Sequence, residues 1–432
     1  MSATRRTFLT HTGVFGASLL GAQRAEAASR SSGRYGREDE LRIGLVGCGG
    51  RGTGAARQAL STEGPVRLVA MADAFADRLD SSLSALTENV PDRVDVPEEQ
   101  RFVGFDAYRE LMALDLDLVV LATPPGFRPA HFEHAVERGL HVFMEKPVAV
   151  DAPGVRRVLA AAQKAKEQKL KVGVGLQRHH SAKYQETIRR IQDGAIGEIR
   201  LLRAYWNGTR PWVRARQPGW NEMTYQMRNW YYFNWLCGDH IVEQHIHNLD
   251  VCNWIMDGFP VEAVGMGGCS LRDPEQGEIF DHHMVEFTYA DGTKMLSQCR
   301  QIAGCWRSVS EHAHGSSGTA NIGAGRIESD GGWSWKFDGE DPNHYQVEHD
   351  DLFRAIREDQ EYGEAELGAL STMTAIFGRM ATYSGKKLSW DEALASTLDL
   401  SPGTYDWNAA PPVLPSADGR YPLPFPGSTT AL

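Results

Sequence analysis

Short apolar runs and stretches of helical character alternate along residues 41–177. The runs are LRIGLV, VRLVAMAD, LDLVVLAT, LHVFMEKP and LKVGVGLQ. The segments between them are longer and place apolar residues at helical spacing, as in the alanine-rich GAARQAL. Strands that alternate with helices in this way predict an α/β fold with a parallel, doubly wound sheet. Such a sheet binds its ligands at the carboxyl ends of the strands.

Residues 178–400 have a different pattern. Strand-like segments such as EIRLLRAYW and HMVEFTYADGTKMLSQCR dominate residues 198–337, and Asp291-Gly292 predicts a hairpin turn. Helical periodicity returns in VEHDDLFRAIRED and ELGALSTMTAIFGRMATYSGK. These patterns predict a second domain that contains both strands and helices. The proline-rich residues 401–432 predict an extended tail that lies over a surface.

The start of the chain does not resemble either domain. The sequence TRRTFL precedes a modest apolar run, and AEA then offers small residues at the spacing of a cleavage site. This pattern predicts a twin-arginine export signal at residues 1–30, with the export machinery as a partner and a periplasmic or otherwise exported location. A frayed N-terminal helix is the alternative. Residues 31–40 predict a polar linker, and no later apolar run reaches the ~18 residues of a membrane span.

Composition and charge narrow the chemistry. Lys and Arg number 45 and Asp and Glu 56, which gives a net charge of −11 and argues against a nucleic-acid partner. The six cysteines form no C-x-x-C pair and are interpreted as mostly core residues, with a Cys299–Cys305 bridge left open. The stretch GDHIVEQHIHNLD offers imidazole and carboxylate groups, but it has no recognised metal-ligand spacing. No metal site is predicted.

A glycine motif follows the first apolar run, where Gly47, Gly49 and Gly52 fit the pattern G-x-G-x-x-G between a strand and a helix. Such glycines allow a tight turn, a close approach of the backbone to a pyrophosphate, and close packing of the helix on the strand. Asp73 ends the second apolar run, where a carboxylate accepts hydrogen bonds from an adenosine ribose and repels a 2′-phosphate. The motif predicts a Rossmann domain that binds NAD, while Arg51 leaves NADP open.

Several of these motifs together resemble the glucose-fructose oxidoreductase, inositol dehydrogenase and MocA family. They are GLVGCGGRG, Thr123-Pro124, the tripeptide Glu145-Lys146-Pro147, and DGAIGEI before a strand. The resemblance covers about residues 41–400. It implies an NAD-binding Rossmann domain at residues 41–177 and, at residues 178–400, a substrate domain with an open, largely antiparallel sheet. It also implies a homo-oligomer, a dimer or tetramer, formed through that sheet.

The resemblance and the positions of the strand ends together predict which residues bind the cofactor. Gln177 and Arg178 end the last run and are expected near the nicotinamide. The expected cofactor-binding residues are Gly47, Gly49, Gly50, Arg51, Gly52, Asp73, Thr123, Pro124, His131, Glu145, Lys146, Gln177 and Arg178.

Catalytic roles are likewise implied by the resemblance. Lys146 is expected beside the nicotinamide, where it binds a substrate hydroxyl. Members of the family commonly have Asp and His four residues apart on a helix, and Glu243 and His247 occupy these positions here. His247 is expected to be the general base and Glu243 to orient it. The longer Glu side chain, and the additional His240 and His245, depart from the family pattern and leave the division of roles open.

A segment rich in tryptophan and arginine, WNGTRPWVRARQPGWNEMTYQMRNWYYFNW, lies between these motifs. Indole rings pack against the C–H faces of sugars, so a carbohydrate platform is one interpretation. An oligomer interface or a latch over the core is the other. The expected substrate-binding residues are Trp212, Arg214, Asn207, Tyr232, Asp239 and His240.

These observations predict an NAD(P)-dependent oxidoreductase that acts on a sugar, polyol or sugar derivative. An exported enzyme has no soluble NAD to rely on, so the cofactor is expected to remain tightly bound. That requirement also admits an NAD-dependent glycoside hydrolase or epimerase, which oxidises its substrate transiently, eliminates and re-reduces. A non-catalytic periplasmic sugar- or nucleotide-binding protein is the second alternative.

Overall fold

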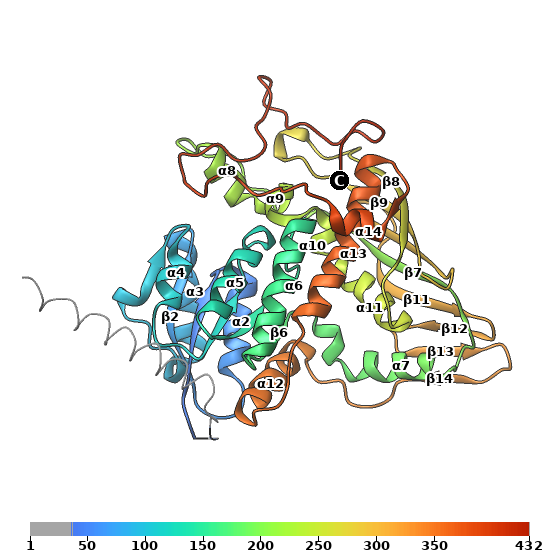
Figure 1. Cartoon of the computed structure of the whole chain (residues 1–432), viewed down its shortest axis with the longest axis horizontal. Helices are drawn as coiled ribbons and strands as arrows, with labels where there is room; N and C mark the ends of the chain where they lie inside the picture. The colour runs from blue at the N-terminus through green and yellow to red at the C-terminus, as the bar shows by residue number, and fades with distance from the viewer. Residues whose placement is uncertain (1–35, 37, 432) are drawn as a thin grey trace, which may run out of the picture.

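The computed structural model describes residue 36 and residues 38–431. The predicted export signal at residues 1–30 lies outside them, as does part of the predicted linker. The described chain is built around two β-sheets, which Figure 1 shows at the two sides of the molecule with helices between them. No helix within the described residues is both long and apolar enough to cross a membrane.

The first sheet is six-stranded and parallel, with the order β3-β2-β1-β4-β5-β6. Its strands are β1 (Leu41–Val46), β2 (Val66–Asp73), β3 (Arg101–Val103), β4 (Leu118–Leu121), β5 (His141–Met144) and β6 (Val172–Val174). Its helices are α2 (Gly50–Leu60), α3 (Ala76–Asn89), α4 (Ala107–Met112), α5 (Arg128–Glu137) and α6 (Ala152–Glu167). The order reverses between β1 and β4, so the connections that leave these two strands diverge and open a crevice at their carboxyl ends.

Both faces of this sheet are buried. Leu41, Ile43 and Leu45 of β1 are fully buried in a core shared with α2 and α3, whereas Val46 belongs to the core on the other face. Strands that are covered on both faces read as continuous apolar runs, which is the pattern of this part of the sequence. The prediction of a doubly wound parallel sheet is confirmed.

The second sheet has nine strands in the order β14-β13-β12-β11-β7-β10-β9-β8-β15. Its strands are β7 (Ile199–Gly208), β8 (Glu262–Gly268), β9 (His282–Thr288), β10 (Lys294–Gln301), β11 (Ser308–Gly315), β12 (Gly318–Asn321), β13 (Arg326–Ser329), β14 (Ser334–Lys336) and β15 (Leu388–Ser389). Only β7 and β10 pair in parallel, so the sheet is largely antiparallel, as expected. The Asp291-Gly292 turn joins β9 to β10 and has Gly292 at φ 89°.

The second half also contains helices, some of which lie between the two sheets (Figure 1). They are α7 (Ala182–Gln192), α8 (Glu222–Arg228), α9 (Asn234–Cys237), α10 (His240–Glu243), α11 (Ile246–Met256), α12 (His344–Arg357), α13 (Ala365–Ser384) and α14 (Trp390–Ala395). The long helix α13 is buried almost throughout and packs on both α6 and β8 (Figure 1). It therefore joins the two halves into one packed unit.

The C-terminal tail, residues 401–431, has no helix or strand and runs over α8 and α9 (Figure 1). It is held there by side chains, since Gln226 donates to the Val413 carbonyl over 2.7 Å and Tyr421 donates to Glu222 over 2.6 Å. The six cysteines are all free thiols, which settles the open question of a Cys299–Cys305 bridge.

Candidate active site

A cleft of about 520 Å³ opens at the carboxyl ends of the parallel strands. One wall is the glycine loop after β1 with the ends of β2, β4 and β5. The other wall is formed by α10, α11 and residues 212–230. Of the expected site residues, the cleft is lined by Gly47, Gly49, Gly50, Arg51, Gly52, Asp73, Thr123, Pro124, His131, Glu145, Lys146, Gln177, Trp212, Arg214, Glu243 and His247.

The glycine loop has the geometry that a pyrophosphate requires. Gly47 has φ +99°, and a Cβ there would lie 2.5 Å from the backbone of Ala122. A Cβ on Gly52 would lie 1.8 Å from the carbonyl oxygen of Gly47, so α2 approaches β1 only because this residue is glycine. A Cβ on Gly49 would meet nothing within 4 Å. The loop thus presents bare backbone and the N-terminus of α2 to the cleft, which suits an anion.

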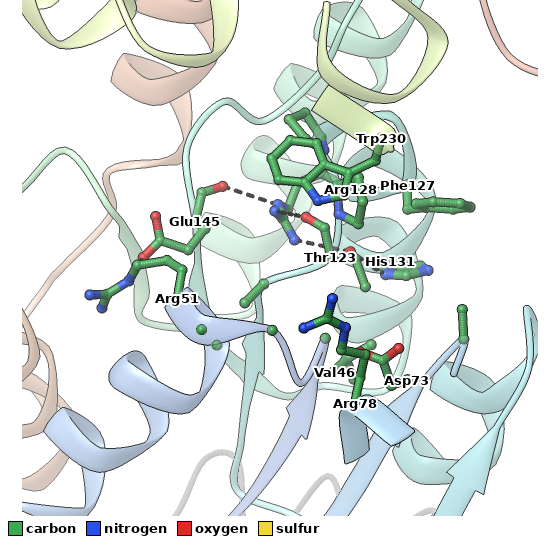
Figure 2. Close-up of a pocket in the computed structure, with 18 of the residues that line it drawn as sticks. Val46, Arg51, Asp73, Arg78, Thr123, Phe127, Arg128, His131, Glu145 and Trp230 are labelled. Carbon is green, nitrogen blue, oxygen red and sulfur yellow. Dashed lines mark hydrogen bonds and ion pairs between the residues drawn. The ribbon is translucent and has the colours of Figure 1, made fainter. Parts of the chain in front are cut away.

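Asp73 lies at the carboxyl end of β2. Its carboxylate accepts hydrogen bonds from the backbone N–H groups of Cys48 (2.7 Å) and Phe75 (2.9 Å), which fix its orientation, while burial raises its pKa. Figure 2 places Arg78 beside Asp73, and Arg51 on the other side of the loop beside Glu145. The Nε of Arg51 lies 2.6 Å from Glu145 Oε1. The cation near the expected ribose site is therefore Arg78. Arg51, which the sequence left open as a partner of a 2′-phosphate, pairs with Glu145 instead.

A fully buried arginine ties the ends of β4 and β5 together. Arg128 donates to the Glu145 carbonyl (3.0 Å) and to the Thr123 carbonyl (2.6 Å), and Figure 2 shows it between these two residues. The Thr123 hydroxyl lies 3.2 Å from His131 Nδ1, whose ring stacks on Tyr108. The adjacent turns are therefore held rigidly where the cofactor site is expected.

Lys146 and Glu243 join the two walls of the cleft. Lys146 Nζ donates to the Glu243 carbonyl (2.5 Å) and to its carboxylate (3.0 Å), so the lysine is anchored at the tip of α10. The sequence predicted one helix in which Glu243 orients His247. Instead, α10 ends at Glu243 and α11 begins at Ile246, and the carboxylate of Glu243 binds Lys146.

His247 lines the cleft next to this pair. Its ring lies nearly parallel to that of Trp206, with centroids 6.0 Å apart, and its Nδ1 is buried without a hydrogen-bond partner within the described residues. Burial lowers the pKa of His247 well below its ordinary value, and the charges of Lys146 and Arg178 lower it further. A neutral imidazole at this place can accept a proton.

Two family profiles match the chain. One, described as an oxidoreductase family with an NAD-binding Rossmann fold, matches residues 41–175. The other, described as the GFO/IDH/MocA C-terminal domain, matches residues 184–321. The chain belongs to the Gfo/Idh/MocA oxidoreductase family. It is an NAD-dependent oxidoreductase, and the family resemblance expected from its motifs is confirmed.

Individual relatives agree with this placement. Inositol 2-dehydrogenase 4 of Saccharopolyspora erythraea is 28% identical over 290 residues, which are 66% of this chain and 74% of that protein. A glycosyl hydrolase family 109 protein of Shewanella pealeana is 25% identical over 181 residues, 39% of this chain and 38% of that one. The crystal structure of aldose-aldose oxidoreductase from Caulobacter crescentus, 19% identical, covers 81% of this chain and 100% of its own with a TM-score of 0.64. That likeness shows a shared fold.

Five residues expected in the site of this Gfo/Idh/MocA protein do not line its cleft. Arg178 pairs with the fully buried Glu311 of β11, and Asn207 lies within β7. Tyr232 is fully buried and donates to the Pro211 carbonyl (3.0 Å), so it supports the neighbouring Trp212 from behind. The other two, Asp239 and His240, are fully buried in a separate cluster.

The cleft also contains residues that the sequence did not nominate. Tyr345 of α12 accepts a hydrogen bond from Gln177 (3.0 Å), and the guanidinium of Arg51 lies 5.1 Å from its ring centroid. Arg228 and Trp230 enter from the second half. The tryptophan-rich composition indicated the segment that contains Arg228 and Trp230. No local sequence motif indicated Tyr345, which is 168 residues from Gln177 along the chain.

Proposed function

We propose that this enzyme oxidises a secondary hydroxyl of a sugar, polyol or sugar derivative with tightly bound NAD. The observation that carries the proposal is the presence of Lys146 and His247 in the same cleft as the glycine loop and Asp73. A relative named inositol 2-dehydrogenase, matched over 66% of this chain, supports a polyhydroxylated ring as substrate.

The expected chemistry divides among three side chains. The neutral imidazole of His247 removes the proton of the substrate hydroxyl as the C=O bond forms, and a bound NAD would supply the hydride acceptor for the same carbon. Lys146 donates a hydrogen bond to that oxygen and stabilises its negative charge. Glu243 is 3.0 Å from Lys146 Nζ and holds the ammonium group in place.

Aromatic and cationic groups at the mouth of the cleft suit a carbohydrate. Trp212 is 41% exposed, its ring lies near that of Trp230 (6.2 Å between centroids), and the guanidinium of Arg214 lies 5.2 Å from it. Indole faces pack against sugar C–H groups while guanidinium N–H groups bind hydroxyl oxygens. We infer that Trp212 and Arg214 bind the substrate.

Retention of the cofactor is supported by contacts across the adenosine end of the cleft. Residues 209–230, here called the strap, cross from the second half, and the Arg228 guanidinium binds both Asp77 oxygens (2.7 and 2.8 Å). The Arg228 guanidinium also lies 3.7 Å from the ring centroid of Phe75, and the ring of Trp407 in the tail lies 5.1 Å from that of Phe75. A nucleotide bound beneath the strap would leave only after these contacts break.

We further propose that the chain is exported by the twin-arginine route and assembles into dimers or tetramers through the nine-stranded sheet. The basis for export is the sequence of residues 1–30. The basis for assembly is the exposure of large apolar side chains on strands of this sheet, with Met266 74% and Val309 52% exposed. Light scattering on the mature protein tests assembly: a monomer mass would reject it.

A redox-neutral glycoside hydrolase is the second candidate. It is favoured by the match to a glycosyl hydrolase family 109 protein, although the match spans only 38% of that relative. It is also favoured by the strap, because a retained cofactor must be re-reduced or re-oxidised within each turnover. In this case a base of the cleft removes a proton next to the transient ketone, and the bond to the leaving sugar breaks as its oxygen takes up a proton. Water then adds to the resulting enone, and the reduced cofactor would supply the hydride that restores the hydroxyl.

One experiment separates these candidates. The purified protein is denatured and the released nucleotide is identified by mass, and the native protein is given inositols, aldoses and aryl glycosides while NADH absorbance is followed. We expect about one NAD per chain and NADH formed from a free polyol or sugar. Glycoside cleavage without net NADH would support the hydrolase, and bound NAD with no reaction of any substrate would support a binding protein. A chain that binds no nucleotide would overturn both enzymatic proposals.

A further inference from the structure

Three side chains with metal-binding groups meet behind the cleft wall. Asp239 precedes α10, His240 begins it, and His283 lies on β9, and all three are fully buried. One potential ligand atom from each lies within 4.8 Å of the others. None of the three lines the active-site cleft, so this cluster has no part in the function proposed above.

The hydrogen bonds of His283 show which of its nitrogens carries a lone pair. Its Nδ1 lies 2.9 Å from the Thr382 hydroxyl, and that hydroxyl donates its own hydrogen to the Arg379 carbonyl (3.0 Å). Thr382 must therefore accept, so His283 Nδ1 donates. In the neutral ring, Nε2 is then an acceptor, and it faces another acceptor, Asp239 Oδ1, at 3.2 Å. Two acceptors at this distance require a proton or a cation between them.

The surroundings of His240 favour a cation over a proton between His283 Nε2 and Asp239 Oδ1. Both of its ring nitrogens are buried without a hydrogen-bond partner within the described residues, and its Nε2 lies 3.8 Å from the same Asp239 oxygen. A second proton on His283 would satisfy the first pair of atoms but would leave His240 unpaired, at a cost of ~1–3 kcal/mol per buried polar group. A cation bound by all three residues gives the Nε2 atoms of both histidines a partner, while His240 Nδ1 stays without one within the described residues.

The carboxylate of Asp239 is already oriented for this role. Its Oδ2 accepts from the Tyr383 hydroxyl (2.6 Å) and from the Phe280 backbone N–H (2.9 Å), while Oδ1 accepts from the His240 backbone N–H and also faces the two imidazoles. The residue has φ 76° and ψ 161°, a conformation that is essentially restricted to glycine. The surrounding packing therefore maintains a strained backbone that delivers this oxygen to the cluster.

We propose that Asp239 Oδ1, His240 Nε2 and His283 Nε2 bind one structural zinc ion. Two imidazoles and one carboxylate suit Zn²⁺, which sits ~2.0–2.2 Å from each ligand and leaves ~3.4 Å between ligands of a tetrahedral site. The separations of 3.2 and 3.8 Å are near that value. A water molecule completes the coordination. The hydrogen bond from His283 Nδ1 to Thr382 is the outer contact that zinc-bound histidines usually make.

The position of the ion gives it a mechanical role. It links the turn before α10 to β9 directly, and to α13 through Tyr383 and Thr382. Helix α10 carries Glu243, which holds Lys146 in the cleft. The ion thus stabilises the wall on which the proposed catalytic pair is mounted. The sequence spacing did not reveal it because His283 is 43 residues beyond His240.

The test is the metal content of the full-length protein, purified without a metal-affinity tag, measured by inductively coupled plasma mass spectrometry. We expect about one zinc per chain in the wild type and less than about a tenth in His283→Gln. The matched control is His349→Gln, because His349 is also fully buried with both nitrogens unpartnered but is not one of the three ligands. This variant should retain about one zinc per chain.

A second measurement on the wild type keeps the proposal falsifiable if the variants fold poorly. Chelation should lower Tm, and refilling with Co²⁺ should restore Tm and give the visible absorption of tetrahedral cobalt. A wild type that contains less than about a tenth of an equivalent of zinc after growth with added zinc, and binds none on dialysis, would overturn the proposal. Equal zinc in the wild type and His283→Gln would also overturn it.

Discussion

Two groups of acidic and imidazole side chains come from one stretch of sequence but face opposite ways. Glu243 and His247 line the cleft, whereas Asp239 and His240 are sealed from solvent behind it. The sequence of residues 239–247 gives both groups the same residue types. Their chemistry therefore differs because of access. The open group, Glu243 and His247, can exchange protons with a substrate, whereas the sealed group, Asp239 and His240, exchanges a bound ion only when the packing around it opens.

The separation of these groups has a structural cause. Helix α10 ends at Glu243 and α11 begins at Ile246, so His247 does not continue the helix that holds His240. His247 lies against Trp206 of β7, and the ring of His240 lies 4.9 Å from that of His283 of β9. A single continuous helix would have aligned the two groups along its length.

The largest expected effect distinguishes the open group from the sealed one. His247→Asn should lower kcat/KM by ~10²–10⁴, because it removes the general base, while bound NAD and Tm stay near their wild-type values. His240→Asn should lower Tm and metal content while kcat changes by less than about tenfold. Steady-state kinetics on both variants measure kcat and KM, and calorimetry measures Tm. A large loss of kcat/KM in His240→Asn and a loss of Tm alone in His247→Asn would contradict the roles given to the two groups.

A smaller effect is expected from the contacts of the strap. Arg228→Gln removes the paired hydrogen bonds to Asp77 and the contact with Phe75, which together are worth on the order of 1.4 kcal/mol, so NAD should dissociate ~10-fold faster. The rate is measured on enzyme loaded with NADH, whose fluorescence changes on release. Arg189→Gln, which breaks exposed ion pairs on α7, is the control. Equal dissociation rates in the two variants would reject the strap as the retaining element.

The smallest expected effect is on the pH profile. A general base must be unprotonated to act, and the lowered pKa of His247 keeps it neutral through the neutral range. The acid limb of kcat/KM should therefore lie below the ordinary histidine value of about 6.5. It should disappear in His247→Asn. A limb at or above that value in the wild type would contradict the buried, neutral imidazole.

The parts of the site that follow directly from a strand end could be predicted from the sequence. Gly47 and Lys146 follow buried strands of the parallel sheet and Asp73 ends one, and the carboxyl ends of such strands converge on one crevice. The fold itself was predictable for the same reason, because strands covered on both faces produce unbroken apolar runs.

The parts that depend on distant contacts could not be predicted. Arg178 looked like a cofactor ligand at a strand end, but Glu311, 133 residues away, binds its guanidinium. Tyr345 of α12 lines the cleft, and no local sequence motif predicts that position. The break between α10 and α11 occurs at Gln244 and His245, without a proline or glycine to mark it.

In the proposed reaction, the open group removes a proton while bound NAD accepts hydride from a sugar or polyol. The most direct test of this reaction is a single-turnover experiment in which NAD-loaded enzyme is mixed with the best substrate of the panel and NADH formation is followed. The wild type should form about one NADH per site, and His247→Asn, loaded with the same amount of NAD, should do so at least ~100-fold more slowly. NADH formation at the wild-type rate in His247→Asn would show that His247 is not the general base.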